Sequence, residues 1–213
     1  MHFVDRHDAG RQLARALMPY RGKDTIVYAL PRGGVVIGFE VARALDAPLD
    51  LVITRKIGHP YNPEYAVCAV TEDGELLCNE SERPSLDPDW LAEEVERERQ
   101  EALRRRKVYL AGKKHISAKD KRAIVVDNGI ATGLTIRAAI QSIRKEKPKE
   151  LIAAVPVAPH GILETLRKEA DIAVALEDAE DYADSVGAYY DSFLQVSDTE
   201  VIDLLKQHEL SNR

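Results

Sequence analysis

A turn that can hold an anion lies at residues 127–135. A run of apolar, strand-forming residues at 124–126 ends at the carboxylate Asp127, a glycine-rich turn follows, and a helical pattern begins at Thr135. Such a turn leaves backbone N–H groups free at the positive end of the helix dipole. Glycines let a ligand approach the backbone closely, and threonine hydroxyls add hydrogen-bond donors. The segment therefore predicts a phosphate site with a carboxylate beside it.

A second turn of the same kind lies at residues 31–34. A short apolar strand ends at Leu30, two glycines bare the backbone, and Arg32 adds a permanently charged donor suited to phosphate oxygens. The alternative is a tight turn with a solvent-facing arginine. Ligands of open α/β sheets bind beyond the carboxyl ends of the strands, where the strand order reverses. Two such turns side by side predict a cleft for a ligand that carries phosphate at both ends.

Arg55 and Lys56 directly follow the strand predicted at residues 49–54. We therefore expect them at the same end of the sheet, where they neutralise ligand charge; ordinary surface charge is the alternative. Residues 57–64 are rich in turn formers and predict a loop that closes over the reaction centre and excludes water. We interpret His59 as a residue of this loop rather than as a general base.

Strand and helix patterns alternate along the rest of the chain. A helix ends near Pro19, and the last helix begins at a capping box formed by Ser197 and Glu200. Between them we predict strands at residues 25–30, 49–54, 151–157 and 172–176 and helices at 35–45, 135–147 and 162–168. The alternation predicts a three-layer α/β fold with a mainly parallel sheet, in which residues 1–213 form a single domain.

The overall composition is that of a globular domain with a substantial core. Of the 213 residues, 45% are hydrophobic and 31% are charged, and the net charge is −6. The acidic balance argues against a nucleic-acid partner, which needs a basic face. No apolar run approaches the roughly 20 residues of a membrane span, and the first residues are polar rather than a signal peptide. We expect a cytoplasmic protein with no membrane partner.

A hairpin is predicted around Gly74. Residues 66–70 and 75–79 flank the turn at 71–74, with Gly74 in the left-handed position. Pairing across this turn puts Cys68 roughly opposite Cys78. We interpret them as two reduced thiols in a cytosolic sheet, since a cross-strand disulfide requires an oxidising or hyperthermophilic setting.

The segment at 124–135 resembles the phosphoribosyl-pyrophosphate (PRPP) motif of type I phosphoribosyltransferases, an apolar strand and two acidic residues followed by Gly-x-Ala-Thr-Gly-x-Thr. Here Asn128 holds the second acidic position. The likeness extends to residues 3–6 with 9–10, residues 30–35, residues 55–60 with 62–64, and residues 186–190 with 193, and so covers nearly the whole chain. It implies a mainly parallel sheet with one antiparallel edge strand, which residues 66–70 would supply. It also implies a small hood that recognises a base, with residues 177–196 as the candidate.

Carried over onto this chain, the resemblance assigns residues 131–135 to the 5-phosphate, residues 32–34 to pyrophosphate, and catalytic roles to Asp127, Arg55 and Lys56. The implied PRPP-binding residues are Arg32, Gly33, Gly34, Asp127, Asn128, Gly129, Ile130, Ala131, Thr132, Gly133, Leu134 and Thr135. The implied cofactor is Mg²⁺, held mainly by substrate oxygens and water, with Asp127 as a metal contact through water. The implied partners are PRPP and an unidentified base, and a homodimer is compatible with the family.

The charged segment at residues 81–117 predicts a mostly helical insertion. Acidic residues alternate with arginines and end in a basic run at 104–107, a pattern typical of a solvated helix face with i,i+4 pairs. The alternative makes the basic end a lid or a pyrophosphate contact. For the base site, the candidates are residues 157–160 and the aromatic side chains Tyr182, Tyr189, Tyr190 and Phe193, with core packing as the alternative for the last three.

The resemblance implies a phosphoribosyltransferase that uses PRPP and Mg²⁺, transfers the 5-phosphoribosyl group to a nitrogenous base or another nitrogen nucleophile, and releases pyrophosphate. Asn128 motivates the alternative, a non-catalytic PRPP- or nucleotide-binding regulatory protein, because an amide brings no charge to stabilise a developing cation. A phosphosugar or nucleotide hydrolase is the third hypothesis. It is the weakest, because the sequence offers no metal-ligand cluster or activated nucleophile.

Overall fold

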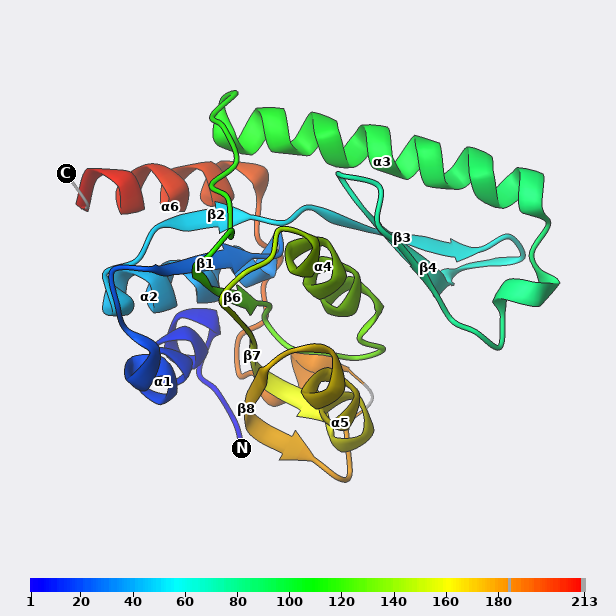
Figure 1. Ribbon diagram of the computed structural model, residues 1–213. Coiled ribbons are helices and arrows are strands. Elements are labelled where there is room, and N and C mark those ends of the chain that lie inside the picture. Colours follow the sequence, from blue (N-terminus) through cyan, green and yellow to red (C-terminus); the bar gives the residue numbers. More distant parts are fainter. Residues whose placement is uncertain (184, 212–213) are drawn as a thin grey trace.

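The main sheet of the protein has five parallel strands in the order β2-β1-β6-β7-β8 (Figure 1). The structure is a computed structural model that describes residues 1–183 and 185–211. The strands are β1 (Thr25–Ala29), β2 (Leu49–Leu51), β6 (Arg122–Val126), β7 (Glu150–Pro159) and β8 (Ile172–Ala179). Each pair of neighbours is parallel, which confirms the fold class expected from the alternation of strands and helices.

Helices cover both faces of this sheet and complete the three layers. One face packs against α1 (Arg6–Leu17), α2 (Gly33–Leu45) and α6 (Asp198–Ser211), and the other against α4 (Leu134–Lys145) and α5 (His160–Glu169). Successive side chains of a strand point to opposite faces. Val27 and Ile124 accordingly belong to the first core, and Tyr28 and Val125 to the second. A short 3₁₀ helix, Met18–Tyr20, follows α1.

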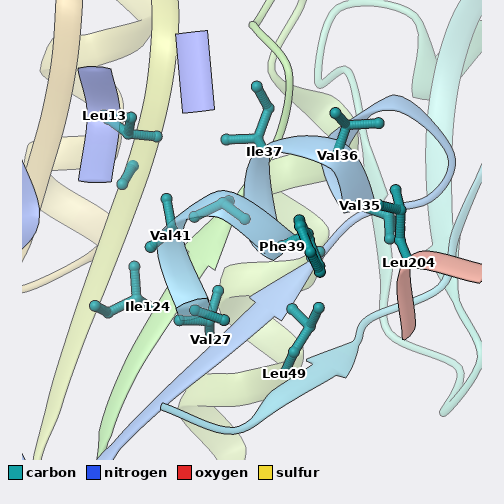
Figure 2. Packing of buried hydrophobic residues seen from close by; sticks show 14 of the residues in the cluster. Leu13, Val27, Val35, Val36, Ile37, Phe39, Val41, Leu49, Ile124 and Leu204 are labelled. Atoms are coloured by element: carbon teal, nitrogen blue, oxygen red, sulfur yellow. The ribbon is translucent and has the colours of Figure 1, made fainter. Parts of the chain in front are cut away.

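The first core is built around α2. Figure 2 shows Ile37, Phe39 and Val41 of this helix above Val27 of β1 and Ile124 of β6. All five side chains are at most 6% exposed. Burial of such a side chain stabilises the fold by roughly 1.5–3 kcal/mol. This packing fixes the start of α2, and therefore the turn at residues 31–34, against the end of β1.

A second, smaller sheet is antiparallel and consists of β3 (Thr54–His59), β4 (Asn62–Thr71) and β5 (Leu76–Cys78). The hairpin predicted around Gly74 is confirmed, but three related expectations are wrong. The single strand expected at 49–54 ends at Leu51, and the chain then enters β3. The loop expected at 57–64 is mostly a hairpin between β3 and β4. The strand expected at the edge of the main sheet lies in β4, which pairs with β3 and β5 instead.

Cys68 and Cys78 form a disulfide, so the interpretation as reduced thiols is wrong. The predicted register is confirmed, because the two residues are directly paired across β4 and β5 with their Cα atoms 4.0 Å apart. Both side chains point into a small core shared with Ile57 and Trp90. The pairing brings the sulfurs together, but the sequence register carries no information about their oxidation state.

The charged insertion is largely one long helix, α3 (Pro88–Leu110), preceded by a 3₁₀ helix at Arg83–Ser85. Asp87 caps α3, because its carboxylate accepts a hydrogen bond from the Trp90 backbone N–H at 2.8 Å. The helix runs along one side of the molecule, from the small sheet, where it begins, to the region of α6 and β2 (Figure 1). No helix within the described ranges combines the length and apolarity that a membrane crossing needs.

The C-terminal elements also follow the predicted pattern. Ser197 Oγ accepts a hydrogen bond from the Glu200 N–H at 3.1 Å at the start of α6, as the capping box predicted. Residues 177–196, the candidate hood, contain the end of β8 and a 3₁₀ helix at Val186–Tyr189; residue 184 lies outside the described part of the chain. The assignment of this segment as a hood stays a prediction.

Candidate functional site

The two predicted turns lie side by side because β1 and β6 are neighbours in register. Ala29 pairs with Val126, and the Leu30 N–H donates a hydrogen bond to the Val126 carbonyl at 3.1 Å just beyond β1. β2 flanks the other side of β1, so the strand order reverses between β1 and β6. The chain segments that leave these two strand ends share a cleft of about 450 Å³.

Most of the residues predicted to form the site line this cleft. They are Arg32, Gly33, Arg55, Lys56, Asp127, Asn128, Gly129, Ile130, Ala131, Thr132, Gly133 and Thr135. Gly34 and Leu134 do not line it: Gly34 lies beneath, against Asp127, and Leu134 is buried against Ala69 of β4 and Ala138. Thr54 and Val186 also line the cleft, although no motif in the sequence marks them, and so does Arg105, which nothing in the sequence distinguishes within the basic run of α3.

The turn before α4 presents unpaired backbone N–H groups to the cleft. Gly133 precedes the first residue of α4 with φ +77, a left-handed conformation that favours glycine. Among the described residues no side chain caps the helix, and its first turn has no acidic residue. Within residues 1–183 and 185–211, nothing accepts a hydrogen bond from the N–H groups of Ala131, Thr132 or Gly133. The turn therefore has the donors that an anion requires.

The other turn packs closely on this one through its glycines. A β-carbon at Gly33 would lie 2.5 Å from Asn128 Nδ2 and 2.9 Å from Arg6 Nε. A side chain there would force Asn128 and Arg6 to move, so the small size of glycine lets the two turns approach each other in this arrangement. The peptide bond between Pro31 and Arg32 is cis.

Asp127 lies where the two turns meet. Its Oδ1 accepts a hydrogen bond from the Asn128 N–H at 2.7 Å. Burial raises the pKa of Asp127 to about 7, while this hydrogen bond and the charges of Lys56 and Arg6 act in the opposite direction. The carboxyl group is therefore poised to change its charge near neutral pH, according to what binds beside it.

Positive charge dominates the cleft. Among the residues that the structure describes, four cations line the cleft, Arg32, Arg55, Lys56 and Arg105, together with one carboxylate, Asp127. Each arginine also pairs with a carboxylate from outside the lining. The pairs are Arg32 with Asp198 at 3.6 Å, Arg55 with Glu98 at 2.7 Å, and Arg105 with Glu101 at 2.9 Å. Such a cleft favours a ligand with several negative charges.

The candidates for recognition of a base are only partly brought to the cleft. Tyr189 and Tyr190 are at most 8% exposed and belong to the first core. The Tyr190 hydroxyl donates a hydrogen bond to the Asn128 carbonyl at 2.5 Å. Phe193 lines the cleft, with the Arg6 guanidinium 3.8 Å from its ring centroid. Residues 157–160 and Tyr182 do not line it.

His59 lies outside the described lining, as expected of a hairpin residue, and its Nδ1 accepts a hydrogen bond from the Tyr61 N–H at 3.2 Å. No group of three or more histidine, cysteine, aspartate or glutamate side chains suited to a metal ion occurs among the described residues. A metal in this cleft would depend on Asp127, water and the oxygens of a ligand.

A sequence model described as the phosphoribosyl transferase domain matches residues 6–192. The chain belongs to the phosphoribosyl transferase domain family. Two proteins of Mycobacterium tuberculosis, named "Putative phosphoribosyl transferase MT0597" and "Putative phosphoribosyl transferase Rv0571c", are each 40% identical to it over 205 residues. The alignments cover 95% of this chain and 46% of each relative, so the chain spans about half the length of the curated relatives it matches.

A solved structure with the same architecture is that of the protein TT1426 from Thermus thermophilus. It is 40% identical to this phosphoribosyl transferase domain and superposes with a TM-score of 0.81, covering 97% of this chain and 99% of that one. The family predicted from the motif at 124–135 is thus confirmed. Arg105 was harder to find in the sequence, because only the packing of α3 decides which cation of its basic run faces the cleft of the phosphoribosyl transferase domain.

Proposed function

We propose that this phosphoribosyl transferase domain uses PRPP and Mg²⁺ to transfer a 5-phosphoribosyl group to a nitrogen nucleophile and releases pyrophosphate. One observation carries the proposal: a turn with unpaired amides and a turn with an arginine share one cleft, with Asp127 between them. PRPP carries a phosphate at one end of a ribose and a pyrophosphate at the other, so its charges match the two turns.

In this proposal the turn before α4 binds the 5-phosphate. The unpaired N–H groups of Ala131, Thr132 and Gly133 and the hydroxyls of Thr132 and Thr135 donate hydrogen bonds to its oxygens. Asp127 follows β6 directly and accepts hydrogen bonds from the ribose hydroxyls. A ligand positioned at both ends has little freedom left, so its reacting carbon is held in a fixed orientation.

The cations of the cleft act on the leaving group. Arg32 and the backbone beside Gly33 bind pyrophosphate, and Arg55 and Lys56 neutralise the charge that grows on it. Mg²⁺ is usually held by one or two carboxylates together with phosphates and water. Among the described residues, Asp127 is the single carboxylate that lines the cleft, so Mg²⁺ fits this site as an ion held mainly by the oxygens of the bound ligand. Such an ion would add charge neutralisation on the pyrophosphate oxygens.

The transfer itself exchanges one bond for another at C1 of the ribose. The bond from C1 to the pyrophosphate oxygen breaks with its electron pair, and the nitrogen of the nucleophile forms a bond to C1 and loses a proton. Positive charge develops on the sugar ring while the bonds exchange. The ionised Asp127 stabilises that charge electrostatically and forms no covalent bond to the substrate.

The test is calorimetry with PRPP and Mg²⁺, followed by a pyrophosphate-release assay with a panel of nucleobases and other nitrogen compounds. We expect saturable PRPP binding and pyrophosphate release with at least one acceptor. Absence of PRPP binding by the folded protein would overturn the proposal.

The second candidate is a regulatory protein that binds PRPP or a nucleotide without turnover. It is favoured by Asn128, which lines the cleft beside Asp127 and supplies no charge. Asn128→Asp separates the two candidates. A regulator is indicated if the wild-type protein binds PRPP without releasing pyrophosphate and the variant restores release. An enzyme is indicated if the wild-type protein already turns over.

A further inference from the structure

The C-terminal half of α3 is fixed to the body of the domain next to the cleft. Arg106 is 14% exposed, and its guanidinium donates hydrogen bonds to the Leu51 carbonyl at 3.0 Å, to Glu72 at 2.6 Å and to Asp50 at 3.0 Å. Tyr109, three residues further on, is 3% exposed and belongs to the first core. Because Arg106 and Tyr109 are held in place, the position of Arg105 on the helix is fixed as well.

Arg105 is oriented so that its terminal nitrogens remain available. Its Nε donates a hydrogen bond to Glu101 Oε1 at 2.9 Å, one turn earlier on α3. Arg55 on β3 is held in the same way, with its Nε 2.7 Å from Glu98 Oε2. In the described ranges, no hydrogen bond involves Nη1 or Nη2 of either arginine. These paired N–H groups form the fork that binds two phosphate oxygens at once.

Arg105 lies near the arginine turn at residues 31–34. The Tyr109 hydroxyl donates a hydrogen bond to Asp198 at 2.7 Å, and the same carboxylate lies 3.6 Å from Arg32. Burial and this hydrogen bond raise the pKa of Tyr109 to about 12, whereas the nearby charges of Arg105 and Arg32 lower it. Arg105 and Arg32 also line the same cleft.

We infer that Arg105 is a binding residue for the pyrophosphate end of the ligand, supplied by the helical insertion rather than by the two turns. The inference rests on the proposed function and deepens it. Pyrophosphate spreads its charge over several oxygens, and Arg32, Arg55 and Arg105 approach it from three separate elements. Arg105 comes from a helix that also packs on the small sheet through Trp90 and Leu91, so α3 joins the cleft to that sheet.

Arg104 provides a matched control. It is adjacent to Arg105, carries the same charge and pairs with the same Glu101 at 2.7 Å, but it is 59% exposed and does not line the cleft. Arg104→Met and Arg105→Met therefore change the net charge equally, and each leaves Glu101 paired with the remaining arginine. A difference between the two variants reports on contact with the ligand rather than on long-range electrostatics.

The experiment is calorimetric titration of the wild-type protein, Arg104→Met, Arg105→Met and Arg105→Lys with three ligands in the presence of Mg²⁺: PRPP, inorganic pyrophosphate and ribose 5-phosphate. We expect Arg105→Met to weaken the binding of PRPP and pyrophosphate about tenfold or more, as expected for the loss of a charge-assisted hydrogen-bond pair. Binding of ribose 5-phosphate should not change. Arg105→Lys should restore part of the affinity, because it keeps the charge and loses the fork.

Two outcomes would overturn the inference while leaving the proposed function intact. In the first, the wild-type protein binds PRPP, and Arg105→Met binds PRPP and pyrophosphate as tightly as the wild-type protein does. In the second, Arg104→Met and Arg105→Met weaken binding equally. If the wild-type protein binds no PRPP at all, the proposed function fails, and the inference fails with it.

Discussion

Gly34 lies directly against Asp127: a β-carbon at Gly34 would be 2.9 Å from Asp127 Oδ1 and 3.1 Å from its Cα. Gly34 is the second residue of α2, and Asp127 is the first residue after β6. The absence of a side chain at Gly34 thus lets the helix that follows β1 pack against the carboxylate that follows β6. The spacing of the two halves of the cleft depends on this contact.

Gly34→Ala should therefore change the cleft as well as the stability. The added methyl group meets backbone that cannot move aside cheaply, so we expect the free energy of unfolding to fall by about 1–3 kcal/mol. We also expect weaker PRPP binding, because Asp127 is displaced. Denaturant titration and calorimetry measure the two effects. Gly161→Ala on α5 is the control, since no atom of the described residues lies within 4 Å of a β-carbon there. Equal effects from both substitutions would contradict the prediction.

Thr132→Val should weaken phosphate binding without affecting the fold. Thr132 is exposed in the cleft, and valine removes its hydroxyl while keeping its shape. We expect ribose 5-phosphate to bind about tenfold more weakly, as for one lost hydrogen bond to a charged group. Stability should stay within about 0.5 kcal/mol of the wild-type protein. Unchanged binding of ribose 5-phosphate would show that this turn is not its site.

Gly133→Val is a less selective test of the same turn. Gly133 has φ +77, and a β-carbon there would lie 2.7 Å from Ile162 Cγ2. A β-branched residue is strained in this conformation, so we expect both PRPP binding and the start of α4 to be disturbed. Circular dichroism and thermal unfolding, measured beside Thr132→Val, separate the two effects. A Gly133→Val protein as stable as the wild-type protein would contradict this expectation.

Activity should depend on the ionisation of Asp127. Because burial raises its pKa to about 7, the carboxyl group of the unliganded protein is largely protonated below neutral pH. We expect kcat/KM for pyrophosphate release to rise with pH through about 7 and to level off above it. Lys56→Met should move this midpoint to higher pH, since Lys56 lowers the pKa of Asp127. A midpoint that stays in place in the variant would exclude Asp127 as the titrating group.

The same carboxyl group makes stability depend on pH. Its folded-state pKa of about 7 lies above the unfolded value of about 3.9, so the native state binds more protons between these limits. Its contribution to stability is full below about pH 4 and is lost as pH rises towards 7. Denaturant titrations at several pH values should show a flatter profile for Asp127→Asn than for the wild-type protein. Parallel profiles would show that Asp127 is not responsible.

The disulfide should stabilise the small sheet. Cys68 and Cys78 are separated by 10 positions, and closing a loop of that length restricts the unfolded chain by about 2–3 kcal/mol. Reduction with dithiothreitol, or the double variant Cys68→Ala with Cys78→Ala, should lower the free energy of unfolding by a similar amount. Because both cysteines lie outside the two main cores, the main sheet should keep its circular dichroism signal. Reductant should have no effect on the double variant, which serves as the control.

Local patterns in the sequence predicted the main sheet and most of the residues that line the cleft. Both turns follow apolar strands and begin helices, and a parallel sheet brings such strand ends to one edge whatever the details of packing. The glycines at 33 and 133 and the carboxylate Asp127 could therefore be assigned to one cleft from their order along the chain. The Ser197 cap was predictable for a similar reason, because its partner Glu200 is only three residues away.

Contacts between segments distant in the sequence decided the rest. The strand containing residues 66–70 pairs with β3 and β5 rather than with the main sheet, and no periodicity indicates which partner a strand takes. The state of Cys68 and Cys78 depends on chemistry that register alone does not specify. Arg105 faces the cleft and Arg104 faces solvent because the neighbouring Arg106 is held by Asp50 and Glu72, far away in the sequence. The spacing of residues in the sequence determined which backbone and side-chain groups could bind phosphate. The packing of distant elements decided which other charged side chains line the same cleft.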